Sequence, residues 1–149
     1  MSATGLEVFD RTLQTTNIWL DEVMEAVGPD RRLAWHVLGA VLRTLRDRLP
    51  SPLAAHLGEQ LPLLVRGVYY EHFDPGHAPL PLYTEDEFLA HVDAECGSAR
   101  PINLRRAVPI ILRVLDEHTS PGLTKKLRHA LPRHVRTLWP ATEGAGATL

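Results

Sequence analysis

The sequence predicts an all-α protein, a compact bundle of six to eight helices made of two pseudo-symmetric helical repeats. Three observations predict this fold. Apolar residues recur every three or four positions through most of the 149 residues, which is the spacing of helices with one buried face. A segment of the first half of the chain recurs in the second half, and Pro and Gly residues stand at the expected helix ends.

The internal repeat is seen when the chain is aligned with itself, without a gap, so that Leu42 lies over Leu112. The identical pairs are Leu42/Leu112, Arg43/Arg113, Leu45/Leu115, Leu53/Leu123, Leu57/Leu127, Leu61/Leu131, Pro62/Pro132, Val65/Val135 and Arg66/Arg136. We therefore expect a single domain over residues 1–149, with repeat unit one at 6–71, a linker at 72–83 and repeat unit two at 84–140. Residues 141–149 are small and unpatterned, so we expect a disordered tail there.

The first repeat is expected to contain two long helices and a split third one. Residues 6–27 carry an apolar stripe along one face, and Gly28 and Pro29 follow as stop and start signals. The next helix runs to about Leu49 and is apolar on more than one face, which predicts a central position. Ser51 and Pro52 are expected to cap and start the third helix.

Prolines divide the last element of each repeat and the segment between the repeats. Pro62 and Pro132 interrupt helical spacing, so we expect breaks near residues 60 and 130. Four residues of the linker, three Pro and one Gly, exclude regular structure from about 72 to 83. Thr84 and Glu87 have capping-box spacing for a helix that ends near Cys96. Two further helices are expected at 100–118, with an uncertain start because of Pro109, and at 121–139.

Composition places the chain among cytoplasmic proteins with no membrane span. Cys96 is the only cysteine, which excludes an intramolecular disulfide and leaves no cysteine-based zinc motif. The first residues lack a basic lead and an apolar stretch, so we expect no signal peptide. Of the 16 basic residues 14 are Arg, a bias typical of GC-rich bacterial genomes.

The net charge of −2 conceals two halves of opposite sign. Residues 1–96 carry 7 basic and 15 acidic residues, whereas residues 97–149 carry 9 basic and 3 acidic ones. Such a division can hold the two halves together or drive self-association, and we favour these two interpretations. It can also attract an acidic partner protein or, less in keeping with a pI of about 6.4, a nucleic acid.

Four segments are similar to a known family, namely FDRTLQTTNIWLDEV, AVLRTLRDRLP, HLGEQLPLLVRGVYYEHFDP and LRHALPRHVRTLWP. The best marks are the two LP-x-x-V-R elements, at 61–66 and 131–136, and the aromatic stretch at 68–73. In these segments the chain resembles the domain of unknown function 2267 family of bacterial and archaeal proteins, over about residues 7–139. The resemblance implies a compact helical fold and a prokaryotic cytosolic protein, and it assigns no catalytic residue.

Candidate metal ligands occur only as a short group in the linker. His72, Asp74 and His77 combine imidazole and carboxylate donors, which suit zinc, iron or nickel, but a further ligand would be needed. The alternative is that these three side chains are solvated loop residues.

Candidate binding residues fall into three groups. Arg66 and Arg136 occupy matching positions, where they bind an anion or, as we favour, cap carbonyls freed by the nearby prolines. Aromatic side chains near the repeat ends either anchor a partner or staple the linker to the fold: Tyr69, Tyr70 and Trp139. A basic stretch of the second half offers an anionic-partner surface: Lys125, Lys126 and Arg128.

These observations favour a non-enzymatic binding or regulatory module that acts through protein–protein contacts or self-association. The sequence contains no Gly-rich phosphate loop, no G-x-S-x-G and no H-E-x-x-H motif, so we expect neither catalytic residue nor cofactor. Two alternatives stay open, namely a metal-binding protein or enzyme that uses the linker histidines, and nucleic-acid binding through the basic half.

Overall fold

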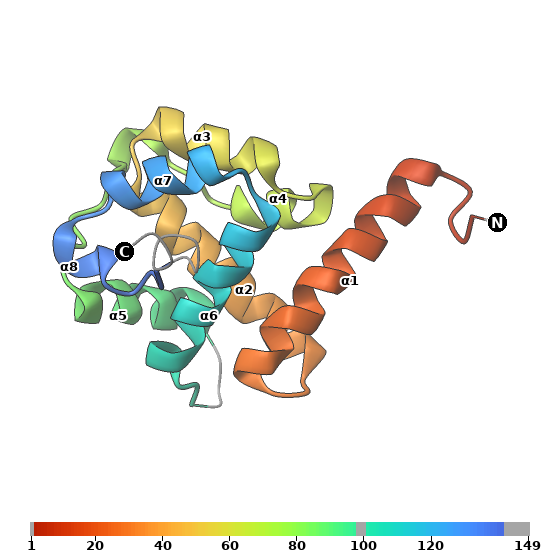
Figure 1. Ribbon diagram of the computed structural model, residues 1–149, viewed down its shortest axis with the longest axis horizontal. Coiled ribbons are helices and arrows are strands. Elements are labelled where there is room, and N and C mark those ends of the chain that lie inside the picture. The colour runs from red at the N-terminus through yellow and green to blue at the C-terminus, as the bar shows by residue number, and fades with distance from the viewer. Residues whose placement is uncertain (1, 98–100, 142–149) are drawn as a thin grey trace, which may run out of the picture.

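The computed structural model describes residues 2–97 and 101–141, which form eight α-helices, one 3₁₀ turn and no strand (Figure 1). The predicted all-α class is thus confirmed. The elements are α1 (Glu7–Val27), α2 (Arg31–Arg48), α3 (Ser51–Gln60), α4 (Leu63–Tyr69), η1 (Pro75–His77), α5 (Glu85–Cys96), α6 (Leu104–His118), α7 (Pro121–Ala130) and α8 (Arg133–Arg136).

Helix α2 is the centre of the core, as its apolar residues on several faces predict. Ten of its residues are buried, and it packs against α1, α3, α4, α5 and α6. The Asp30 side chain accepts a hydrogen bond from Leu33 N at 3.1 Å and so caps the first turn. Helix α6 lies along α1 and also contacts α5, while α3 and α7 lie side by side (Figure 1).

Proline ends the third helix of each half at the predicted place. Helix α3 ends at Gln60 and α4 begins at Leu63, and α7 and α8 are separated in the same way by Leu131 and Pro132. The two starting caps differ, however. Ser120 accepts from Leu123 N at 3.2 Å, as predicted. The expected Ser51 cap is wrong, because α3 already includes Ser51 and its hydroxyl turns to the Pro75 carbonyl.

The boundaries of α5 and α6 are set by polar caps. Thr84 accepts a hydrogen bond from Glu87 N at 3.1 Å, as its capping-box spacing predicts. Helix α6 begins at Leu104 rather than at residue 100, because Asn103 caps it by accepting from Arg106 N at 3.3 Å. Residue 100 itself, and residues 142–149 of the expected tail, lie outside the described part of the chain.

The predicted apolar stripe of α1 is only half covered. Thr16, Leu20 and Val23 are buried against the other helices. Leu6 and Phe9, in contrast, are 51% and 47% exposed. The cause is the position of α1, whose N-terminal half extends beyond the other helices (Figure 1).

No helix in the described part of the chain combines the length and the apolar character needed to cross a lipid bilayer.

Candidate functional site

An exposed apolar surface lies on the free half of α1 and on α4. We call it the α1/α4 face and define it by large apolar side chains that are 42–57% exposed: Leu6, Val8, Phe9, Leu13, Leu63 and Leu64. Two other large exposed apolar side chains lie elsewhere. Ile18 is nine residues from Phe9 and therefore half a turn away around the helix, and Tyr83 precedes α5. The exposed apolar surface of the described residues is thus concentrated in one region.

A cavity of about 440 Å³ opens beside this face, between α1, the α3–α4 turn and the end of α6. Val8, Thr12 and Trp19 of α1 line one side of it, and Leu63 and Arg66 line the opposite side. Helix α4 is tied to α1 at this point, because Leu64 N donates to the Thr12 hydroxyl at 3.4 Å. The region therefore offers both a projecting apolar ridge and a hollow next to it.

The two matched arginines both serve the proline breaks. Arg66 donates three hydrogen bonds of 2.8–2.9 Å to carbonyls at the end of α3. Arg136 donates two of 3.1–3.5 Å to carbonyls at the end of α7. A helix end leaves carbonyls without intrahelical donors, and these guanidinium groups supply them. The geometry agrees with the capping interpretation of both residues.

Of the aromatic residues at the repeat ends, Tyr69 and Trp139 lie inside the fold and Tyr70 is half-buried. Tyr69 is fully buried, and its hydroxyl donates to the Ala54 carbonyl at 2.6 Å. Tyr70 is half-buried and contacts the Tyr69 ring edge-on, with centroids 5.0 Å apart. Trp139 is 6% exposed, and its Nε1 donates to Asp116 at 2.9 Å. These contacts fasten the ends of α4 and α8.

Burial also sets the acid–base behaviour of Tyr69. Burial, and next to it the Tyr70 hydroxyl, raises the pKa of Tyr69 well above its usual value of about 10. The folded state then keeps the proton while the unfolded chain loses it, so this group stabilises the fold fully below pH 10. We expect the free energy of unfolding to fall above pH 10 by about 1.4 kcal/mol per pH unit.

The measurement is chemical denaturation at pH 9, 10 and 11, for the wild type and for Tyr69→Phe. The phenylalanine variant should lose the part of the alkaline slope that comes from this group. Equal slopes in both proteins would contradict the assignment.

The basic residues of α7 separate into two kinds. Lys125 and Lys126 are exposed and form no ion pair with any described residue. Arg128 instead donates to Asp116 at 2.6 Å, and its guanidinium lies 5.3 Å from the centre of the Trp139 ring. Arg128 is thus engaged within the fold, and of these three residues the two lysines present free charge.

The linker histidines lie around a small cavity of about 90 Å³. His72, Asp74 and His77 line it together with Asp47. Asp74 is hydrogen-bonded to His77 and also accepts from Gly76 N at 3.1 Å. Two other groups, however, have three ligand atoms that all lie within 4.8 Å of one another.

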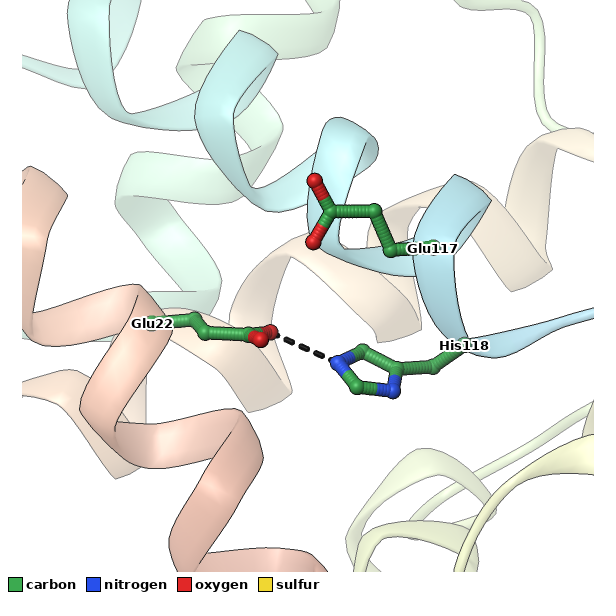
Figure 2. Close-up of side chains that lie close together, drawn as sticks. All are labelled: Glu22, Glu117 and His118. Carbon is green, nitrogen blue, oxygen red and sulfur yellow. Dashed lines mark hydrogen bonds and ion pairs between the residues drawn. The ribbon is translucent and has the colours of Figure 1, made fainter.

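The first of these groups joins α1 to the end of α6, and it was not found from the sequence. It consists of Glu22, Glu117 and His118 (Figure 2). His118 Nε2 lies 2.7 Å from a Glu22 carboxylate oxygen, and the imidazole stacks on Trp19 with centroids 5.0 Å apart. Glu117 and His118 are adjacent in sequence, but only the fold brings Glu22 to them.

The second group joins the end of α2 to α5. It consists of Asp47, His91 and Glu95. Asp47 accepts from Arg46 Nε at 2.8 Å, and Arg43 Nε lies 3.9 Å from Glu95. Both carboxylates therefore already face an arginine.

Comparison with known proteins adds one match. The family model described as "Uncharacterized conserved protein (DUF2267)" matches residues 16–138. No curated protein matches the chain.

Proposed function

The chain belongs to the DUF2267 family, and because its description assigns no activity, we propose a function from the geometry. We propose a non-enzymatic helical interaction module that associates with a second copy of itself through the α1/α4 face. The observation that carries this proposal is the concentration of half-exposed Leu, Val and Phe side chains on that face.

The free energy of burying such a surface supports the proposal. Removing apolar area from water contributes about 25 cal/mol per Å², and contiguous exposed apolar patches mark interaction sites on soluble proteins. The face also lies beside a hollow of about 440 Å³. A partner helix can therefore bury apolar side chains against both the ridge and the hollow, which is the helix-in-groove mode of recognition.

A second copy fits as the partner because the same surface carries both an apolar ridge and a hollow, and these two shapes are complementary. A two-fold dimer uses the same patch on both subunits, so the patch must be self-complementary. Antiparallel pairing of two α1 helices about Phe9 brings Leu6 of one copy near Leu13 of the other. Glu7 and Arg11, which pair at 2.6 Å, lie on the opposite side of α1 and stay exposed outside this contact.

The division of charge supports internal use of the basic half over nucleic-acid binding. Arg105 of the basic half contacts Glu85 at 3.0 Å and also contacts Asp86, both from the acidic half. Nucleic-acid binding through exposed basic residues of this half, Lys125 and Lys126 among them, is the alternative. It predicts an affinity that falls steeply with salt.

We also propose that the fold is a duplicated unit with approximate two-fold symmetry. Helix α2 packs against α5 as α6 packs against α1. Arg66 and Arg136, which occupy matching positions of the two repeats, both cap the helix that precedes them. Asp47 and Glu117, which the same alignment also pairs, each belong to a group of acidic and His side chains at a helix end.

The self-association proposal is tested with Phe9→Asp, which changes an exposed side chain and should leave the fold intact. The contact occurs twice in a two-fold dimer, so a loss of about 1.5 kcal/mol per copy weakens the dimer about a hundredfold. Sedimentation velocity over a concentration series measures the dissociation constant of both proteins.

Tyr83→Ser is the matched control, because it removes an exposed aromatic side chain outside the face. It should leave the dissociation constant unchanged. A wild type that stays monomeric at 200 µM, or a Phe9→Asp variant that associates like the wild type, would overturn the proposal.

A further inference from the structure

Two carboxylates and one imidazole meet where α1 packs against the end of α6 (Figure 2). We propose that Glu22, Glu117 and His118 form a binding site for a divalent transition-metal ion of the Zn²⁺ class. One candidate ligand atom of each residue lies within 4.8 Å of the other two. None of the three residues belongs to the α1/α4 face, and although His118 lines the cavity next to that face, metal binding and self-association are tested with different variants.

The donor set and its spacing suit such an ion. Imidazole nitrogen and carboxylate oxygen bind Zn²⁺ at about 2.0–2.2 Å, so tetrahedral ligand atoms lie about 3.4 Å apart. His118 Nε2 and Glu22 are 2.7 Å apart and need to separate by less than 1 Å. The Glu117 side chain is exposed and forms no hydrogen bond with a described residue, so it can move to complete the set.

The charges at the site also call for a cation. Within the described residues, neither Glu22 nor Glu117 forms an ion pair with a lysine or arginine, and Glu22 contacts only the His118 imidazole. Helix α6 ends at His118, so its terminal carbonyls add negative partial charge at this point. A divalent ion neutralises the two carboxylates and binds the neutral imidazole.

The fold holds the imidazole in place before any ion binds. The Trp19 side chain is 1% exposed, and its ring stacks on His118 with an interplanar angle of 27°. His118 also lines the cavity of about 440 Å³. Three protein ligands leave one position of a tetrahedral ion open, and that position is then available to water or to a small anionic ligand.

The second group of ligand atoms differs from the first because its carboxylates already have arginine partners. Arg46 and Arg43 already face the carboxylates of Asp47 and Glu95, and His91 Nδ1 lies 3.0 Å from the Thr44 hydroxyl. A cation there would compete with two fixed guanidinium groups. This group therefore serves as an internal control.

The experiment is calorimetric titration of the metal-free, full-length chain with ZnCl₂. We expect one site per chain with a dissociation constant at or below about 10 µM. Titration with Co²⁺ reports geometry separately, because four-coordinate Co²⁺ with nitrogen and oxygen ligands absorbs strongly in the visible range. A wild type that binds neither ion more tightly than about 1 mM overturns the proposal.

The variants are Glu117→Gln, His118→Asn and, as control, Glu95→Gln. Glu117→Gln and His118→Asn should each weaken Zn²⁺ binding at least tenfold, while Glu95→Gln should bind like the wild type. The exposed Glu117 makes its variant informative even where His118→Asn disturbs the packing on Trp19. Unchanged affinity in Glu117→Gln and His118→Asn, or a loss only in Glu95→Gln, would place the ion elsewhere and overturn the assignment.

Discussion

Replacing Arg46 with methionine is expected to lower the free energy of unfolding by about 3 kcal/mol or more. The Arg46 side chain is almost completely buried, and its Nη1 donates to the carbonyls of Tyr69 and Glu71, both at 2.7 Å. Its guanidinium also lies 5.0 Å from the centre of the Phe73 ring. Methionine keeps the stem of the side chain but leaves these carbonyls without a donor, and each unpaired buried acceptor is costly.

Urea denaturation at one fixed protein concentration measures this loss. Arg32→Met is the matched control, because Arg32 is exposed on the same helix. This control should change the free energy of unfolding by at most about 0.5 kcal/mol. The free energy of unfolding of Arg46→Lys should lie between those of Arg46→Met and Arg32→Met, because an ammonium group replaces the planar guanidinium group. Equal stability of Arg46→Met and Arg32→Met would show that the buried guanidinium does not hold the end of α4.

Trp19→Ala is expected to destabilise the protein by about 3–5 kcal/mol. Trp19 is 1% exposed in the core between α1 and α6, where it also supports the His118 ring. Truncation removes a large apolar side chain from this core and leaves a cavity in its place. The neighbouring cavity would then extend into the core.

Thermal and urea unfolding of Trp19→Ala and Trp35→Ala check this expectation. Trp35 is only partly buried, so the same chemical change should be clearly less damaging there. A Trp35→Ala variant at least as unstable as Trp19→Ala would show that the packing of α1 on α6 is not a principal source of stability.

Helix α1 connects the two proposals. Its N-terminal half carries most of the α1/α4 face, and its C-terminal half carries Glu22. Val8 of the face and His118 of the metal-ligand group both line the cavity, whereas Phe9 and Glu117 do not. Binding of a metal ion and association of two copies can therefore be measured separately, with Glu117→Gln and Phe9→Asp as independent variants.

For several candidate residues the sequence left two interpretations open, one as a binding surface and one within the fold. Arg66 was expected either to bind an anion or to cap carbonyls, and its hydrogen bonds go to carbonyls at the end of α3. Tyr69 and Trp139 were candidate anchors for a partner, yet both are buried. An aromatic side chain near a helix end has the same sequence signature whether it is an exposed anchor or a buried core residue, because its burial depends on which helices cover it.

The sequence alone determined the helical class, the proline breaks and several of the helix ends. These features depend on interactions within a few residues, such as the missing N–H of Pro62 or the capping of α5 by Thr84. The tertiary structure decided the features that depend on packing between helices far apart in the sequence. It left the N-terminal part of the α1 stripe exposed at Phe9 and Leu13, directed Arg46 to the end of α4, and brought Glu22 to His118 across 96 residues of chain. No local pattern specifies these contacts, because each requires two helices far apart in sequence to pack together.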